Sequence, residues 1–150
     1  MPAHPPAEIL RLAGIECAAT AERLGAVVRL DADRVRDALS ALQTVGYDFL
    51  VDLFGTDTGE QIEVTYHLRE FASGENLCVK VLVDYDGEAP SVWRVYPSAL
   101  FAERECAELL GMSFPGHPNP KRLLTTEDLP PMLRKSELIR EAGEVQLPYE

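Results

Sequence analysis

The sequence is short of the residues that redox sites require. Its three cysteines, Cys17, Cys78 and Cys106, lie far apart and form no Cys-x-x-Cys pair. Iron–sulfur clusters are held by grouped cysteine thiolates, so we expect no cluster to be bound by this chain. Because any disulfide would leave one cysteine over, we expect reduced thiols, which are typical of a cytosolic compartment.

Long apolar runs and nucleotide-binding motifs are missing as well. No run approaches the ~20 apolar residues that a membrane-spanning helix needs. Neither Gly-x-Gly-x-x-Gly nor the P-loop occurs, so the sequence shows no recognisable site for NAD or another nucleotide. The first ten residues lack the basic region and the apolar core of a secretory signal. We therefore expect any association with a membrane to be peripheral.

Positive charge is scarce. The 150 residues include 14 Lys and Arg against 25 Asp and Glu, which gives a formal net charge of -11. Nucleic acids and anionic lipids attract clusters of basic side chains, so we expect neither as a partner. The basic pairs are Lys121–Arg122 and Arg134–Lys135. Weak surface ion pairs would explain them, and docking to an acidic surface of another protein is the interpretation that we favour.

What the sequence has is enough apolar residues for a globular core. With 46% hydrophobic residues, one domain followed by a tail is expected. The strand patterns at 47–54 and 62–68 predict an antiparallel hairpin. In the helix predicted before it, over 33–45, Asp31 is expected to cap the start and Gly46 to end the helix. The periodicity predicts helices over 7–16, continuing through 17–24, and over 33–45, and strands over 25–30, 47–54, 62–68 and 77–84. The fold class predicted is α+β, a single domain with a mixed β-sheet flanked by helices.

The most informative stretch joins a charged helix to a stiff loop. Ser98 follows a proline and Gly111 ends an apolar pattern with helical spacing, which predicts a helix of about three turns between them. The loop MSFPGHPNP that follows contains three prolines, which fix the backbone and remove donors, and Gly116 can adopt a left-handed turn. An ordered loop that ends in Lys121–Arg122 is typical of a surface that contacts another molecule.

The predicted helix carries four charged side chains within six positions, Glu103, Arg104, Glu105 and Glu108. Arg104 and Glu108 have the spacing of an ion pair, and a solvated helix face is the plainer interpretation of the run. Glu103 and Glu105 point apart on a helix and have no nucleophile or metal motif beside them, so we do not expect acid–base catalysis. His117 has no Cys, Asp or His at ligand spacing, and we interpret it as a hydrogen-bonding loop anchor rather than a metal ligand.

The segment ERECAELLGMSFPGHPNPKRLL resembles the signature of the small hydrophilic subunit of respiratory complex I, the 30 kDa or C subunit of NADH-quinone oxidoreductase. The segments YHLR at 66–69 and PSA at 97–99 are also similar to segments of this family. The text PMLRK at 131–135 matches in part, with Met132 where the family has proline. The resemblance marks the following residues as signature or partner-interface positions: Glu103, Arg104, Glu105, Glu108, Gly111, Phe114, Gly116, His117, Pro118, Lys121, Arg122, Arg134 and Lys135.

The resemblance implies a structural subunit of the peripheral arm of a complex I-like oxidoreductase, on the cytoplasmic side of the inner membrane. This chain would bind no cofactor. It would pack against the large quinone-site subunit and the small iron–sulfur subunit, and other subunits would hold the iron–sulfur clusters and a flavin or NiFe centre. Residues 1–124 would form the domain, with the helix and the Gly-His-Pro loop at its end, and residues 125–150 an extended tail that docks on the partners.

Two alternatives stay open. One is the equivalent subunit of an energy-converting NiFe hydrogenase or of a ferredoxin- or F420-linked relative, and the other is a free-standing acidic adaptor. For the isolated chain, we expect the tail to be mobile from Leu129 onward.

Overall fold

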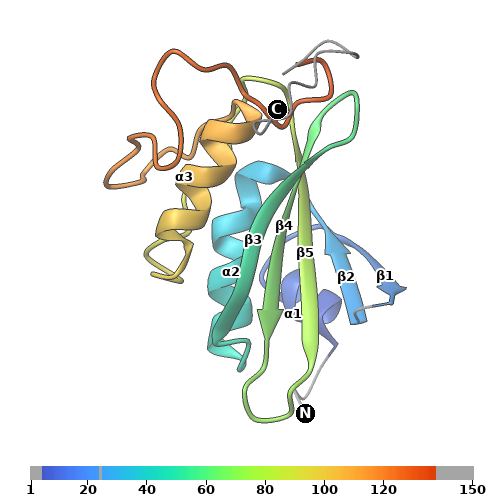
Figure 1. Ribbon diagram of the computed structural model, residues 1–150. Helices are drawn as coiled ribbons and strands as arrows, with labels where there is room; N and C mark the ends of the chain where they lie inside the picture. The colour runs from blue at the N-terminus through green and yellow to red at the C-terminus, as the bar shows by residue number, and fades with distance from the viewer. Residues whose placement is uncertain (1–4, 24, 138–150) are drawn as a thin grey trace, which may run out of the picture.

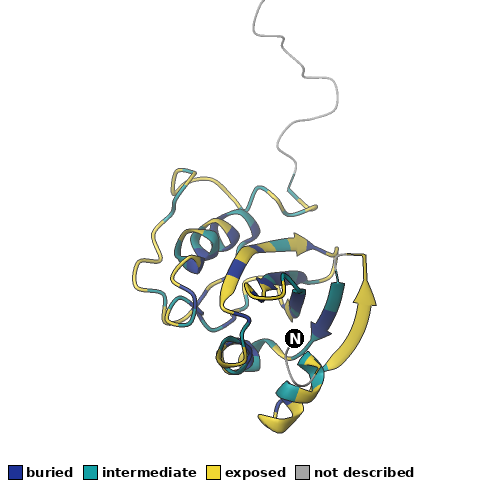
Figure 2. Ribbon diagram, turned by 90° about the horizontal axis from the view of Figure 1, so that it is seen from below, coloured by how far each residue is buried: buried dark blue, intermediate teal, exposed yellow. Residues whose placement is uncertain are grey.

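A five-stranded mixed sheet forms the centre of the molecule, and three helices lie on one of its faces (Figure 1, Figure 2). The computed structural model describes residues 5–23 and 25–137. The strands lie in the order β1-β2-β5-β4-β3. Their bounds are Ala18–Glu22 for β1, Gly25–Arg29 for β2, Phe49–Asp57 for β3, Ile62–Arg69 for β4 and Asn76–Val83 for β5. The helices are α1 (Pro6–Leu12), α2 (Val35–Thr44) and α3 (Ala99–Leu110), with a 3-10 turn, η1 (Ala32–Arg34), before α2.

Strands β3, β4 and β5 form an antiparallel meander, and β1 and β2 form a second antiparallel pair. The two units are joined by the parallel pairing of β2 with β5. The hairpin predicted for residues 47–68 is thus confirmed, as is the mixed sheet. On the helix side of the sheet, Tyr66 lies between Leu53 and Val79, and all three side chains are buried. The core is therefore a single layer of side chains between sheet and helices.

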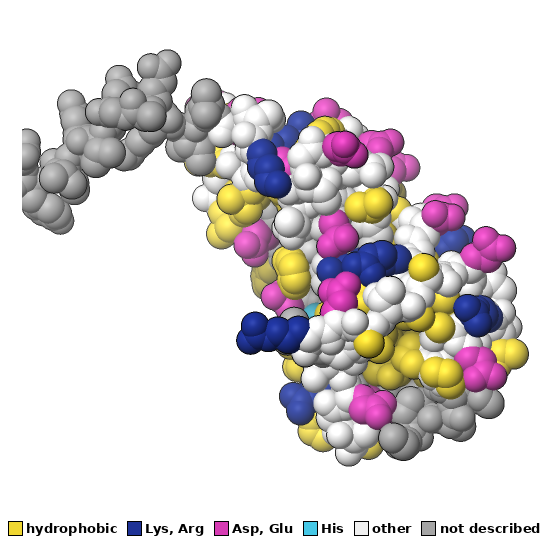
Figure 3. Space-filling model, turned by 90° about the vertical axis from the view of Figure 1, so that its right-hand side faces the viewer, with side chains coloured by type: hydrophobic (Ala, Val, Ile, Leu, Met, Phe, Trp, Pro, Cys, Tyr) yellow, Lys and Arg dark blue, Asp and Glu magenta, His cyan; other side chains and the backbone are white. Residues whose placement is uncertain are grey.

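The other face of the sheet is more polar. Lys80 of β5 lies 3.2 Å from Glu63 of β4 and 3.7 Å from Glu22 of β1, and Arg29 of β2 lies 2.7 Å from Glu22. Figure 3, seen from the side of β1 and β2, shows acidic and basic side chains next to one another. Solvated ion pairs of this kind contribute about 0–1 kcal/mol each to the free energy of unfolding. Their main effect is therefore to keep this face of the sheet hydrated.

Helix α3 packs against β3 at a glycine. A Cβ atom on Gly55 would overlap Cδ1 of Leu110 and would stand 2.9 Å from Sγ of Cys106. Burial, followed by the nearby charges of Glu105 and Glu103, raises the pKa of the Cys106 thiol to about 12, so this thiol is unreactive. All three cysteines are free, as expected. Among the residues that the structure describes, no helix is long and apolar enough to cross a membrane.

Three local predictions are wrong. Residues 18–22 form the edge strand β1 and do not continue a helix. Every residue of β1 is exposed, so this segment offers a helix no apolar face, and its backbone bonds to β2 decide its structure. Neither Asp31 nor Ser98 caps a helix with its side chain. The carbonyl of Asp31 accepts from the N–H of Arg34 instead, at 3.0 Å.

Replacement of Gly55 by alanine tests the close approach of α3 and β3. We expect Gly55→Ala to lower the free energy of unfolding by about 1–3 kcal/mol, because the methyl group must push the helix away from the strand. Urea unfolding of the isolated chain measures this. Thr56→Val on the exposed side of the same strand is the control and should change the stability by less than ~0.5 kcal/mol. Equal midpoints for the two variants would contradict the packing described.

Candidate functional site

The loop after α3 is hydrogen bonded to the segment that follows β5. The N–H of Ser113 donates to the carbonyl of Gly87 at 3.0 Å, and the N–H of Ala89 donates back to the carbonyl of Ser113 at 3.1 Å. One step further, the N–H of Ser91 donates to the carbonyl of Pro115 at 2.8 Å. Prolines remove donors and keep their carbonyls, so the loop joins its neighbour largely as an acceptor. Two segments far apart in the sequence thus form one block.

Glu103 fastens α3 to that block. Its side chain is fully buried, Oε1 accepts from the N–H of Val92 at 2.7 Å, and Oε2 accepts from Oγ of Ser91 at 2.5 Å. Burial raises the pKa of this carboxyl, and the two hydrogen bonds and the nearby His117 oppose the rise. The residue is therefore a structural acceptor held between helix and loop.

His117 closes the block from the loop side. Its Nδ1 accepts from the N–H of Asn119 at 3.0 Å, which places the proton of the neutral ring on Nε2. Nε2 then donates to the carbonyl of Leu100 at 2.8 Å and lies 3.9 Å from Oε2 of Glu103. With 3% of its side chain exposed, His117 is the hydrogen-bonding loop anchor that the sequence suggested.

Glu108, one turn further along α3, binds the segment that follows the loop. Its carboxylate accepts from the backbone N–H groups of Leu123, Leu124 and Thr125. Burial acts to raise the pKa of Glu108, but the hydrogen bonds from Thr125 and from the other two N–H groups lower it to about 2. The side chain therefore stays ionised at neutral pH and orders residues 123–125.

The arginines of the signature bind carbonyl oxygens of this chain. Arg104 donates to the carbonyls of Lys121 and Arg122, at 2.7 Å and 2.8 Å. Arg122 in turn donates to the carbonyls of Thr126 and Leu129, at 2.8 Å and 2.9 Å. The predicted ion pair between Arg104 and Glu108 is not formed, because each of the two side chains binds backbone groups of the 121–125 segment instead.

Arg134 brings the next segment back to the end of α3. Its guanidinium donates to the carbonyls of Leu110 and Gly111, at 2.6 Å and 2.7 Å, and to Oδ1 of Asp86 at 3.0 Å. These carbonyls are among those that a helix end leaves without an internal partner. The cation also lies at the negative end of the helix dipole. Gly111, with φ of 71°, ends the helix as predicted.

Asp57, at the end of β3, holds the residue after Arg134. Its Oδ2 accepts from the N–H of Lys135 at 2.7 Å, and its Oδ1 accepts from the hydroxyl of Tyr85 and from the N–H of Gly59. The Tyr85 hydrogen bond, followed by the two backbone bonds, lowers the pKa of Asp57 to about 2. Residues 125–137 are thus attached to the domain, and residues 138–150 of the predicted tail lie outside the described residues.

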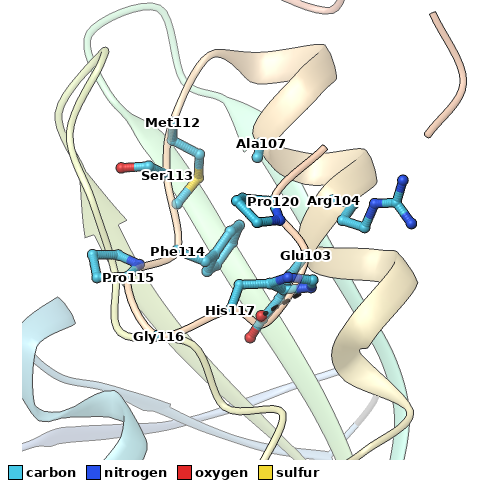
Figure 4. Close-up of a pocket in the computed structure, with 10 residues that line it drawn as sticks. All are labelled: Glu103, Arg104, Ala107, Met112, Ser113, Phe114, Pro115, Gly116, His117 and Pro120. Atoms are coloured by element: carbon cyan, nitrogen blue, oxygen red, sulfur yellow. Dashed lines mark ion pairs between the residues drawn. The ribbon is translucent and has the colours of Figure 1, made fainter. Parts of the chain in front are cut away.

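A cavity of about 340 Å³ opens between α3 and the loop (Figure 4). Ala107, Met112, Phe114 and Pro120 line it, and Glu103 and His117 lie at one end, where a dashed line in Figure 4 marks their 3.9 Å approach. The figure shows the Arg104 guanidinium pointing away from this space. The volume is at the lower end of small-ligand sites, and its mainly apolar wall suits an apolar side chain. The described residues contain no group of three or more His, Cys, Asp or Glu placed to hold a metal ion.

The structure brings part of the predicted set together and leaves part of it outside. Glu103, Arg104, Phe114, Gly116 and His117 surround the cavity. Pro118, Lys121, Lys135 and Glu105 are exposed. Sequence reasoning missed Ser91 and Asp57, because a serine in a loop and an aspartate between two predicted strands show no pattern that indicates a distant partner.

Comparison with known families identifies the chain. Residues 28–141 match the family model described as the respiratory-chain NADH dehydrogenase 30 kDa subunit. The chain belongs to this family. The C subunit of the NADH-quinone oxidoreductase of Moorella thermoacetica is 38% identical over an alignment of 118 residues, and the match covers 72% of this chain and 80% of the relative. The C subunit of Phenylobacterium zucineum is 40% identical over an alignment of 98 residues, and the match covers 63% of this chain but only 47% of the relative. The chain thus matches about half the length of that second 30 kDa-family protein.

Two solved structures share the fold of this chain. A trypsin-resistant fragment of Nqo5 is 29% identical with a TM-score of 0.65, and the match covers 75% of this chain and 94% of the fragment. A chain of the membrane-bound sulfane sulfur reductase, an archaeal respiratory membrane complex, is 25% identical with a TM-score of 0.70. This match covers 81% of the present chain and 74% of the reductase chain. The expected α+β domain with a mixed sheet is therefore confirmed.

Replacement of Glu108 by glutamine tests the site at residues 123–125. We expect Glu108→Gln to lower the free energy of unfolding at pH 7 by about 1–3 kcal/mol, because one amide oxygen replaces a charged acceptor of three N–H groups. The ordinary carboxyl pKa of 4.5 falls to about 2 in the folded chain, so the folded state resists protonation between these values. The contribution of Glu108 is thus fully present above pH ~4.5 and is lost as the pH falls toward 2.

The measurement is urea unfolding of the wild type and Glu108→Gln at several pH values between 7 and 2.5. The difference between them should shrink steadily below pH ~4.5, while Glu60→Gln, in an exposed turn, should follow the wild type throughout. A difference that stays constant over this range would show that Glu108 is not held as described.

Proposed function

We propose that this chain is a structural subunit, equivalent to the C subunits of its relatives, in the peripheral arm of a complex I-like NADH-quinone oxidoreductase. The membership of residues 28–141 in the 30 kDa subunit family is the observation that carries the proposal. Electron transfer in such an assembly would proceed through flavin and iron–sulfur clusters held by other subunits. This chain would supply a rigid protein surface that keeps them in place.

The hydrogen bonds of the signature residues support a structural role. Glu103 and Glu108 accept from groups of this chain, and Arg104, Arg122 and Arg134 donate to its carbonyls. A catalytic acid or base must reach a substrate proton within hydrogen-bond distance. These side chains instead maintain the shape of the α3 end and its loop, which is what a docking surface needs.

For partners, we propose the large quinone-site subunit and the small iron–sulfur subunit, on the cytoplasmic side of the inner membrane. Lys121 and Lys135 are exposed on the segment that surrounds the end of α3 and are the cations that we assign to acidic partner surfaces. The remaining tail, with residues 138–150, would extend the same contact.

The equivalent subunit of an energy-converting hydrogenase is less favoured. The Moorella and Phenylobacterium relatives are both NADH-quinone oxidoreductase subunits, and the archaeal neighbour belongs to a sulfane sulfur reductase. A free-standing acidic adaptor does not agree with membership in a family of respiratory subunits.

The decisive experiment is purification of the tagged chain from detergent-solubilised membranes of its source organism. Mass spectrometry of the co-purifying proteins, with flavin and nickel analysis, reads the result. We expect a large quinone-site subunit, a small iron–sulfur subunit and flavin. Nickel with a hydrogenase-type large subunit would replace the proposal by the hydrogenase alternative. Recovery of the chain alone would refute both.

A further inference from the structure

A second hollow lies on the other flank of α3, between that helix and β3. It is a narrow groove of about 90 Å³, and we call it the α3–β3 groove. Phe54 of β3, Leu109 of α3 and Leu133 of the following segment line it, and Phe54 and Leu133 are 45% and 57% exposed. Phe101, one turn before Glu105 on the same side of α3, is 65% exposed. Exposed large apolar side chains on neighbouring elements commonly mark interaction surfaces.

Three separate segments build the groove. Leu133 reaches it because its N–H donates to the carbonyl of Leu109 at 2.8 Å. The next residue, Arg134, binds the end of α3, so Leu133 is held from both sides. The interactions that attach the 129–137 segment thus place an exposed leucine at the groove, although burying that leucine would have been the more stable arrangement.

The groove has one charge. Glu105 is the carboxylate side chain in its lining. Within residues 5–23 and 25–137, Glu105 makes no hydrogen bond and no ion pair, whereas Glu103 and Glu108 on the same helix are fully engaged. Among the described residues, no lysine or arginine lines the groove to compensate this charge. The surface therefore complements a cation that is flanked by apolar groups.

We propose that the α3–β3 groove binds a segment of a neighbouring subunit that places apolar side chains on Leu133 and Phe101 and an arginine or lysine beside Glu105. This inference rests on the proposed function and names the surface through which one partner docks. Aromatic anchors at the centre of an interface carry much of its energy. An arginine can pair with Glu105 and also lie over the Phe101 ring, as Arg104 of this chain already does at 6.0 Å.

Photo-cross-linking in the assembled complex identifies the occupant. The tagged chain with benzoylphenylalanine at position 101 is produced in the source organism, and the purified complex is irradiated and digested for mass spectrometry. We expect a cross-link to another subunit, in a peptide with apolar residues next to an arginine or lysine. A cross-link to a second copy of this chain, or none in an otherwise complete complex, would overturn the inference.

Three substitutions test the same surface by the amount of the other subunits that co-purifies with the chain. Phe101→Asp, Leu133→Asp and Glu105→Lys should each lower the recovery of the other subunits about tenfold, the effect expected of interface anchors. Phe71→Asp is the matched control, because Phe71 is 81% exposed in the loop after β4, outside the three segments that build the groove. Urea unfolding of the isolated variants verifies that each is folded.

The outcomes separate the two proposals. Wild-type chain that recovers no other subunit refutes the proposed function itself. Wild-type chain that recovers the complex, with all three groove variants recovering it equally well, leaves the proposed function standing and refutes the groove.

Discussion

A buried carboxyl group that accepts hydrogen bonds from a neighbouring segment fixes the geometry of the signature region. Glu103 ties α3 to residues 91 and 92, and His117 approaches it from the loop at 3.9 Å. A buried acceptor that loses its donors costs about 1–3 kcal/mol, so helix, segment and loop are stable only together. The cavity beside α3, the path of residues 118–125 and the position of the following segment all depend on this block.

Arginine completes the structure where regular secondary structure ends. The loop and the 121–137 segment are irregular and rich in proline, so many of their carbonyls have no partner in a helix or strand. Arg104, Arg122 and Arg134 each donate to two of these carbonyls, and the planar fork of the guanidinium holds its donors in a fixed geometry. An acidic chain with few cations thus uses three of them internally, while Lys121 and Lys135 stay on its surface.

The accuracy of the sequence-based predictions follows the range of the interactions involved. Helix α2, the β3–β4 hairpin and the glycine at the end of α3 follow from local periodicity and turn chemistry, and the predicted elements agree with the structure. Strand β1 was missed because its pairing with β2, and not its own apolar pattern, creates it. The absent Arg104–Glu108 pair is instructive as well. Helical spacing brings the two charged side chains within reach of each other. Both bind backbone groups of the 121–125 segment instead.

By itself the sequence determined the α+β class, the stiff loop, the free thiols and, through one contiguous signature, the family. These properties reside in composition, in short-range periodicity or in residues adjacent in the chain. Only the tertiary structure decided the strand order, the parallel pairing of β2 with β5 and the partner of each carboxylate. The carboxylate partners are backbone N–H groups 11 residues away for Glu103 and 78 residues away for Asp57. Every residue except proline carries such a group, so no pattern in the sequence reveals which one will be bound.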